Sequence, residues 1–154
     1  MLFRSIEGEE RGQSEAIARN LAVMSELKTP ILVVVTGEGG SGGALAISVG
    51  DNIAMLQYAT YSVASPEACA SIIWRTADKA SDAAEAMKVS ANELKKLKII
   101  DEIIEEPLGG AHRDYDLISS NIKDSLIKNL SALNSMSMEQ LLDRRYKRLV
   151  EIGI

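Results

Sequence analysis

The segment GEGGSGG at residues 37–43 holds the residues best suited to chemistry in this chain of 154 residues. It follows the apolar run ILVVVT and precedes the small-residue run ALAISVG, which places it where a buried strand turns into a helix. Its spacing matches two catalytic motifs at once. Counted from Gly37 it reads G-x-G-x-x-G, as in dinucleotide-binding loops, and counted from Gly39 it reads G-x-S-x-G, as in hydrolase nucleophile elbows with Ser41 as the nucleophile.

Neither a dinucleotide nor a phosphate loop agrees with the surrounding residues. A dinucleotide-binding loop is followed about 20 residues later by an acid that binds the ribose hydroxyls, but the corresponding stretch QYATYSVAS contains none. Glu38 within the segment would repel a pyrophosphate. A phosphate loop needs a lysine followed by serine or threonine after its glycines, and this pair is missing.

A serine hydrolase remains open on spacing. Asp101 and His112 follow Ser41 in the chain order of the α/β-hydrolase triad, and His112 is the only histidine. The same residues agree with a simpler interpretation, in which the flanking glycines only make the loop flexible and His112 bonds to backbone groups of the PLGGAHRD loop.

The interpretation that we favour makes the backbone the catalyst. The first N–H groups of a helix have no partner within the helix, and two of them can hold an oxygen that gains negative charge in a transition state. Gly42 and Gly43, directly before the apolar ALAI, would supply these two N–H groups. The alternative is that the five glycines of the segment only allow a helix and a strand to pack closely.

Three strand-like runs alternate with helical patterns along the chain, and no internal repeat is visible. This alternation predicts an α/β fold in which helices cover parallel strands. We expect strands within 31–36, 53–64 and 99–104, the second of them bent, and helices within 9–30, 44–50 and 65–98 and from 115 onward.

Several helix starts are marked by side chains that can cap the first N–H groups. Ser65 precedes Pro66 and an acid, which predicts an N-cap and a proline at the first helical position. Ser90 and Ser137 are each followed three positions later by Glu or Gln, the capping-box pattern. The segment 114–152 predicts two helices that we expect to serve packing or assembly rather than to cover the sheet.

Charge and cysteine content narrow the class of protein. The formal net charge is −5 and no stripe of Lys and Arg is present, which argues against nucleic acid as a partner. The cluster RRYKR at 144–148 is expected to be a solvated helix face, or a contact to an acidic partner. The single cysteine, Cys69, is expected to be a small residue of the core and cannot form a disulfide within the chain. Because no membrane span or signal peptide is visible either, we expect a cytoplasmic protein.

Several long segments together resemble one family. EERGQSEAIARN, GEGGSGGALAISVGD, MLQYATYSVASPEACASI, EPLGGAHRD and DRRYKRL, in this order over residues 7 to about 150, are similar to the carboxyltransferase α subunit of bacterial acetyl-CoA carboxylase. The resemblance implies a crotonase-like (ClpP/crotonase) α/β fold, a β-β-α superhelix that is only partly present, followed by C-terminal helices. It also implies that residues 1–154 form a single carboxyltransferase domain fragment.

The resemblance implies a function in fatty-acid biosynthesis. Such enzymes transfer a carboxyl group from carboxybiotin, carried on a biotin carboxyl carrier protein, to acetyl-CoA and so form malonyl-CoA. The α subunit works with a homologous β subunit, commonly as α2β2, and the active site lies between them. Carboxybiotin and acetyl-CoA are therefore expected as substrates, with no covalently bound cofactor, no metal and no membrane or nucleic-acid partner.

Site residues also follow from the resemblance. The glycine pair that is thought to receive the biotin ureido oxygen falls on Gly42 and Gly43, the same two amides that the spacing favours. Gly39 and Gly40 are expected to shape the approach to these amides. The further candidates, for the biotin-facing wall, are Tyr58, Tyr61, Ser65 and Pro66, with core packing as the alternative role of the tyrosines.

The chain departs from the family pattern in its length. The family's α subunit is considerably longer, and this chain enters it partway through the fold. Residues 1 to about 6 match nothing in the pattern and are expected to be junction sequence. An exposed sheet edge is expected where preceding strands would pair. A non-catalytic assembly module that binds the β subunit therefore stays open as a second function.

Overall fold

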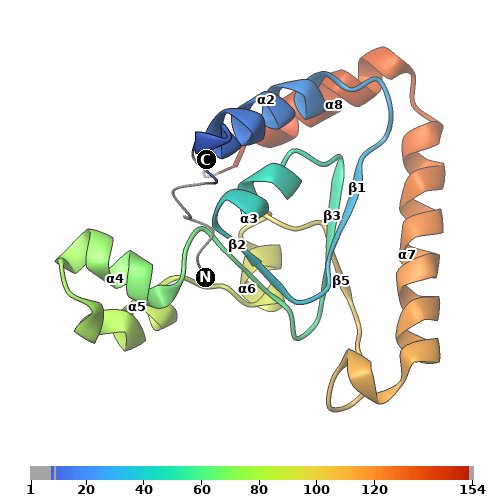
Figure 1. Ribbon diagram of the computed structural model, residues 1–154. Helices are drawn as coiled ribbons and strands as arrows, with labels where there is room; N and C mark the ends of the chain where they lie inside the picture. Colours follow the sequence, from blue (N-terminus) through green and yellow to red (C-terminus); the bar gives the residue numbers. More distant parts are fainter. Residues whose placement is uncertain (1–7, 9, 153–154) are drawn as a thin grey trace.

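The computed structural model describes residue 8 and residues 10–152, so the predicted junction sequence at residues 1 to about 6 lies outside the described residues. Strands and helices alternate along the described part, as predicted (Figure 1). The strands are β1 (Leu32–Val35), β2 (Glu38–Gly40), β3 (Asn52–Leu56), β4 (Thr60–Ser62) and β5 (Glu102–Ile104). The helices are α2 (Gln13–Glu26), α3 (Ser41–Ile47), α4 (Pro66–Trp74), α5 (Ala80–Ala86), α6 (Ala91–Lys96), α7 (Tyr115–Asn134) and α8 (Met138–Val150), with 3-10 turns at Ala77–Lys79 and Ala111–Arg113.

The strands form two small parallel sheets. One has the strand order β1-β3-β5, and the other pairs β2 with β4. The predicted bend within 53–64 is the turn between β3 and β4, which belong to different sheets. The sequence did not predict β2, because EGG has low strand propensity and becomes a strand through its pairing with β4.

Two β-β-α units follow one another in the chain. β1 and β2 lead into α3, and β3 and β4 lead into α4, with each strand of the first unit parallel to its counterpart in the second. This is the β-β-α repeat that the resemblance implies. The sequence shows no repeat, because the two units share topology and register rather than residue identities.

The core is centred on strand β3. All five residues of β3 are buried, whereas β1 is buried only at Val35. The prediction of a buried strand therefore holds for β1 only at its end, because β1 lies at an edge of the described sheet and pairs with β3 alone. Other members of the buried apolar cluster include Leu94, Ile100, Ile104 and Ile118.

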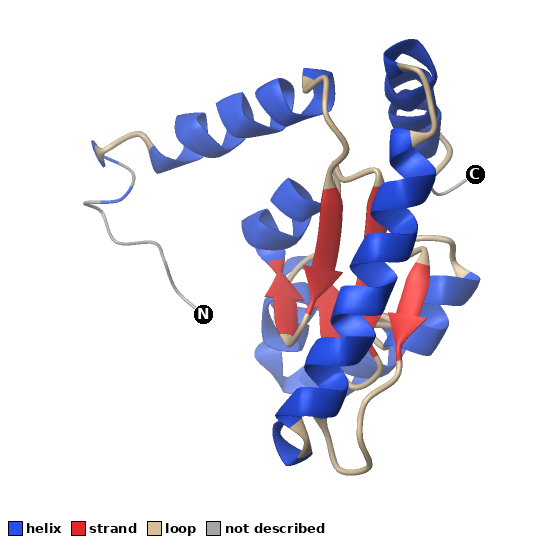
Figure 2. Ribbon diagram, turned by 90° about the vertical axis from the view of Figure 1, so that its right-hand side faces the viewer, coloured by secondary structure: helices blue, strands red, loops and turns tan. Residues whose placement is uncertain are grey.

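Helix α7 covers the main sheet, so the expectation that segment 114–152 serves only packing or assembly is wrong for this helix. Figure 2 shows α7 crossing in front of the strands, and α7 contacts β1 and β5. The Glu102 carboxylate accepts hydrogen bonds from three side chains of α7: Ser125 at 3.0 Å, Lys128 at 2.7 Å and Asn129 at 2.6 Å. Burial raises the pKa of Glu102, but these hydrogen bonds outweigh burial and hold the pKa below the ordinary value of 4.5.

Two aspartates repeat one hydrogen-bond pattern at the amino ends of the main sheet. The Asp51 N–H donates to the Ile31 carbonyl at 2.8 Å, and Oδ2 of Asp51 accepts from the Ile31 N–H at 2.7 Å. Asp101 makes the same two bonds with Ile53, again at 2.8 Å and 2.7 Å. Each carboxylate satisfies a backbone N–H at the start of the neighbouring strand, which fixes the strand register at this edge.

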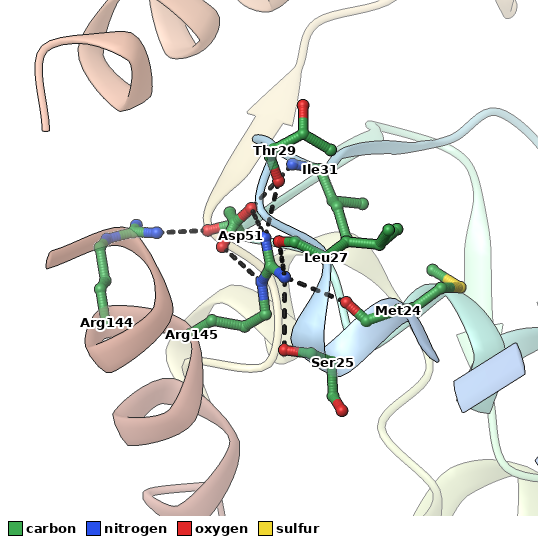
Figure 3. A network of polar contacts seen from close by, with 8 residues as sticks. All are labelled: Met24, Ser25, Leu27, Thr29, Ile31, Asp51, Arg144 and Arg145. Atoms are coloured by element: carbon green, nitrogen blue, oxygen red, sulfur yellow. Dashed lines mark hydrogen bonds and ion pairs between the residues drawn. The ribbon is translucent and has the colours of Figure 1, made fainter. Parts of the chain in front are cut away.

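Arg145 and Arg148, three positions apart on α8, bind these two aspartates. Arg145 is 1% exposed, and its Nε and Nη2 donate to the two carboxylate oxygens of Asp51 at 2.9 Å and 2.7 Å (Figure 3). Arg148 donates to Oδ2 of Asp101 at 3.0 Å. Arg145 also donates to the backbone carbonyls of Met24, Ser25, Leu27 and Thr29. The predicted solvated face is therefore wrong for these two arginines, which hold α8 against the sheet.

Two of the three predicted side-chain caps form, and the third does not. Ser65 caps α4, and Ser137 closes a capping box at the start of α8. Ser90 lies at the N-cap of α6 without a side-chain hydrogen bond. The Glu93 carboxylate, which would complete the capping box, pairs with Lys96 at 2.7 Å instead.

Helices α4 and α5 form a hairpin that projects from the body of the molecule (Figure 1). Cys69 is half-buried within this hairpin, so its predicted place in the core is wrong. Three apolar side chains of α4 are exposed: Ile72 (76%), Ile73 (63%) and Trp74 (39%).

Candidate active site at the glycine turn

The glycine segment consists of a strand followed directly by a helix, in agreement with the predicted strand-to-helix transition. α3 follows β2 without an intervening residue. β4 holds β2 by parallel pairing that places Gly39 and Gly40 opposite Tyr61 and its neighbour. Gly42 and Gly43 consequently lie in the first turn of α3, where backbone N–H groups have no partner within the helix.

Two helices start at the same edge of the small sheet. Because β2 and β4 are parallel, the strand ends that lead into α3 and α4 lie side by side. Ser65 and Pro66, at the start of α4, therefore lie at the edge that carries Gly42 and Gly43. The Ser65 hydroxyl is engaged there, since it accepts a hydrogen bond from the Ala68 N–H at 3.2 Å.

The space around each glycine shows whether close packing alone explains why a glycine stands there. A Cβ on Gly39 would lie 2.9 Å from Cδ2 of Tyr61, so packing requires a glycine at this position. A Cβ on Gly42 would lie 3.7 Å from Cδ1 of Ile17, which is an ordinary contact. Among the residues that the structure describes, a Cβ on Gly43 would meet nothing within 4 Å. Close packing thus accounts for Gly39 but not for Gly43.

The two tyrosine candidates differ in burial. Tyr61 is 8% exposed, and its hydroxyl donates to the Ala44 carbonyl of α3 at 2.6 Å. Burial raises the pKa of Tyr61, so its hydroxyl stays protonated at neutral pH. Tyr58 is 54% exposed in the turn after β3. Core packing, the alternative role of both, therefore holds for Tyr61 and is wrong for Tyr58.

The side-chain contacts do not assemble a hydrolase triad. The Asp101 carboxylate accepts from the Ile53 N–H and from Arg148 rather than from His112. His112 is exposed in the 3-10 turn before α7, and no hydrogen bond within the described part of the chain joins it to Ser41. Ser41 has φ of 54°, in the left-handed region. Without a serine–histidine contact, a nucleophilic serine has no base beside it.

Sequence reasoning missed one carboxylate that joins two loops. Oε2 of Glu106 accepts from the Tyr58 N–H at 2.6 Å, and Oε1 accepts from the Ala111 N–H at 2.8 Å. Glu106 thereby joins the turn between β3 and β4 to the PLGGAHRD loop. The sequence carries only a weak signal for this role, an acid directly before a proline and two glycines.

Metal-binding clusters and membrane-spanning helices are both absent from the part of the chain that the structure describes. There, no three or more His, Cys, Asp or Glu side chains gather in a way that could hold a metal ion. Among the same residues, no helix combines the length and the apolar character needed to cross a membrane.

The chain is similar in sequence to one known protein family. Residues 2–153 match the family model described as acetyl co-enzyme A carboxylase carboxyltransferase-like. The acetyl-coenzyme A carboxylase carboxyl transferase subunit alpha of Histophilus somni (strain 129Pt) is 63% identical over 98% of this chain, and that of Pseudoalteromonas atlantica is 60% identical over the same share. The chain spans 48% of the length of each of these two relatives.

Solved structures of similar shape agree on the fold. A transcarboxylase 12S has a TM-score of 0.59 at 20% identity, covering 68% of this chain and 22% of that one. A Pseudomonas malonate decarboxylase hetero-tetramer has a TM-score of 0.56 at 14% identity, covering 75% and 50%. An enoyl-CoA hydratase/isomerase from Marinobacter aquaeolei has a TM-score of 0.56 at 15% identity, covering 90% and 51%.

These neighbours have crotonase-like folds, which confirms the predicted fold class of parallel strands and helices in β-β-α units. The family model covers nearly the whole chain, and the sequence relatives carry the same family name. The chain therefore belongs to the acetyl co-enzyme A carboxylase carboxyltransferase family.

Proposed function

We propose that this chain is the C-terminal part of a carboxyltransferase α subunit and takes part in moving a carboxyl group from carboxybiotin to acetyl-CoA, which forms malonyl-CoA. The name of its relatives supports this reaction. The role of the glycine turn rests on one observation: no described atom lies within 4 Å of a Cβ on Gly43, in the first turn of α3.

Gly42 and Gly43 act through their backbone N–H groups in this proposal. In the forward reaction the bond between the biotin nitrogen and the carboxyl carbon breaks, and a carbon–carbon bond to the methyl carbon of acetyl-CoA forms. The ureido oxygen of biotin gains negative charge as the first bond breaks. Two N–H donors that point at this oxygen stabilise the transition state more than the ground state.

The proton in this reaction passes from the methyl group of acetyl-CoA to the biotin nitrogen that has lost its carboxyl group. The substrate thus supplies the base. This agrees with the surroundings of His112, the only histidine, which is exposed and bonded to neither Ser41 nor Asp101. A protein base would have to lie within hydrogen-bond reach of the proton that it removes.

The neighbouring residues receive supporting roles. Gly39 and Gly40 shape the turn through their pairing with β4. Ser65 and Pro66, at the same edge as the amides, are proposed to face biotin. Tyr58, which is exposed, lies before the start of β4 and thus at the other end of that strand, so we assign it no contact with biotin. The proposed partners are a carboxyltransferase β subunit, in an α2β2 assembly, and a biotin carboxyl carrier protein, and the proposed compartment is the cytoplasm.

A second candidate function is an assembly module that binds the β subunit without catalysis. The exposed apolar side chains of the projecting α4–α5 hairpin favour it, since Ile72 and Ile73 bury little of their surface within the chain. Exposed apolar patches of this kind mark protein contacts. Both candidates need the β subunit, and they differ in whether the glycine turn affects turnover.

The reverse reaction separates these two functions. Purified β subunit is assayed for malonyl-CoA-dependent carboxylation of biocytin, with and without this chain. Activity that appears only with the chain supports the carboxyltransferase proposal. A β complex seen by size exclusion that has no activity supports the assembly module instead.

Gly43→Val then tests the amides. The Cβ of the valine contacts no described atom within 4 Å, so we expect the variant to fold, while the side chain blocks the approach of a ligand to the first turn of α3. We expect the rate to fall by about a hundredfold or more, the loss caused by removing an oxyanion donor. Gly37→Val is the matched control, because a Cβ on Gly37 also meets nothing within 4 Å. Equal activity of the two variants would exclude Gly43 from the site.

A further inference from the structure

We infer that Tyr61 is a positioning residue for the glycine turn and that it fixes the direction of the Gly42 and Gly43 N–H groups from inside the protein. The inference rests on the proposed function, because it concerns the task of those two amides. Tyr61 is buried and its hydroxyl is already engaged, so it acts through the backbone and not by contact with substrate.

Tyr61 contacts the glycine turn on both sides. On the strand side its ring lies directly against Gly39, where an added Cβ would approach Cδ2 to 2.9 Å. On the helix side its hydroxyl donates to the Ala44 carbonyl at 2.6 Å. Gly42 and Gly43 lie between these two contacts in the chain. Tyr61 thus ties the strand that enters the turn to the helix that leaves it.

Tyr61 is itself held firmly. Its backbone N–H donates to the Val89 carbonyl at 3.1 Å, and its side chain belongs to the buried apolar cluster. A side chain that is fixed by the core and by neighbouring strands can transmit its position to the segment that it contacts.

The expected consequence concerns the transition state. Two N–H groups stabilise a developing charge only when both point at the oxygen, and a displacement of about 1 Å can cost a hundredfold in rate. Loss of the Tyr61 hydroxyl leaves both amides in the chain but removes the link between the Tyr61 ring and the Ala44 carbonyl, which keeps its bond from the Ser48 N–H. Binding of substrate depends on the rest of the site, so kcat should fall while KM stays nearly the same.

The test compares Tyr61→Phe with Tyr146→Phe. The second variant removes a hydroxyl from a side chain of α8 that is 66% exposed. Hydrogen exchange of residues 38–48, measured by mass spectrometry on the chain itself, should become about three- to tenfold faster in Tyr61→Phe, the effect of losing one hydrogen bond. In the complex with the β subunit, kcat for biocytin should fall by about ten- to a hundredfold with KM within about threefold. Tyr146→Phe should change neither.

Each outcome decides for or against the inference. Unchanged exchange together with unchanged kcat in Tyr61→Phe would overturn it, and so would a raised KM at constant kcat, because that result assigns Tyr61 to substrate binding. If the wild-type complex is inactive, the proposed function fails and hydrogen exchange alone decides about Tyr61. If Tyr61→Phe does not fold, Gly39→Ala replaces it, since the added Cβ displaces the ring from the other side. Exchange of residues 38–48 at the wild-type rate in Gly39→Ala would then overturn the inference.

Discussion

Arg145→Met removes the guanidinium that joins α8 to the start of the main sheet while it keeps much of the apolar length of the side chain. In the folded protein this guanidinium is 1% exposed, and its ion-pair partner Asp51, at 2.7 Å, is fully buried. The substitution therefore removes the cation that pairs with the buried Asp51 carboxylate, while Arg144 still donates to the Asp51 backbone carbonyl at 2.6 Å. The backbone carbonyls that follow α2 lose their donor at the same time (Figure 3).

The size of the effect follows from the burial of the pair. Removing one partner of a buried ion pair lowers the free energy of unfolding by about 3–5 kcal/mol. We expect the lower end of this range, about 3 kcal/mol, because the Ile31 N–H still donates to the Asp51 carboxylate. The double variant Arg145→Met/Asp51→Asn should recover part of the loss, since asparagine is neutral and can still accept from Ile31.

Urea unfolding followed by circular dichroism at pH 7 measures these differences. Lys147→Met is the matched control on the same helix, because its ion pair with Asp143 is exposed on both sides and its loss should leave the midpoint unchanged. Two results would refute the reasoning: an equal midpoint for Arg145→Met and Lys147→Met, or a double variant as unstable as Arg145→Met alone. Either would mean that the buried pair does not hold α8 in place.

Three further substitutions test other contacts by the same unfolding measurement. Glu102 has a folded pKa below 4.5, so its carboxylate stabilises the fold above the unfolded pKa and this contribution is lost as the pH falls through the folded pKa. Glu102→Gln should thus be less stable than the wild type at pH 7, with a deficit that shrinks in acid; a deficit independent of pH would contradict this. Gly50→Ala places a Cβ 2.6 Å from Cγ2 of Val33 and should lower the free energy of unfolding by about 1–3 kcal/mol. In the control Gly37→Ala the added Cβ meets no described atom within 4 Å, so the loss of stability should be smaller. Equal losses in the two variants would contradict the packing argument. Ser65→Ala removes the cap of α4 and should cost about 1 kcal/mol with faster hydrogen exchange in that helix alone; unchanged exchange there would show that the cap is dispensable.

Sequence reasoning succeeded where the cause of a structure is local. Ser65 and Ser137 cap helices because the accepting oxygen and the N–H group lie three positions apart in the chain. Ser90 shows the limit of such patterns. Its side chain makes no cap hydrogen bond, and the Glu93 carboxylate that would complete the capping box pairs with Lys96, three positions later.

Arg145 shows why the remaining features could not be predicted. A run of basic residues on a helix is usually solvated, and its local sequence does not mark one of them as buried. Its partner Asp51 lies 94 positions away in the chain. Strand β2 also depends on a contact that is distant in the sequence, because its glycines form a strand only when β4, about 20 positions later, lies beside them. Glycine spacing located the turn, but only the folded chain separates Gly39, which packs against Tyr61, from Gly43, which faces open space.

The inward-facing arginines and Tyr61 act on different parts of the molecule, and this difference can be measured. Arg145 and Arg148 hold the amino ends of the strands through Asp51 and Asp101, whereas Tyr61 holds the turn that carries the amides. Backbone amides cannot adjust by rotating a side chain, so their precision must come from the residues packed around the turn. Loss of the Arg145 guanidinium should therefore lower stability while the molecules that stay folded keep their kcat. Loss of the Tyr61 hydroxyl should lower kcat, with a smaller loss of stability. If instead the Arg145 variant loses more kcat and the Tyr61 variant loses more stability, then the whole sheet, and not the nearest buried side chain, fixes the position of the turn.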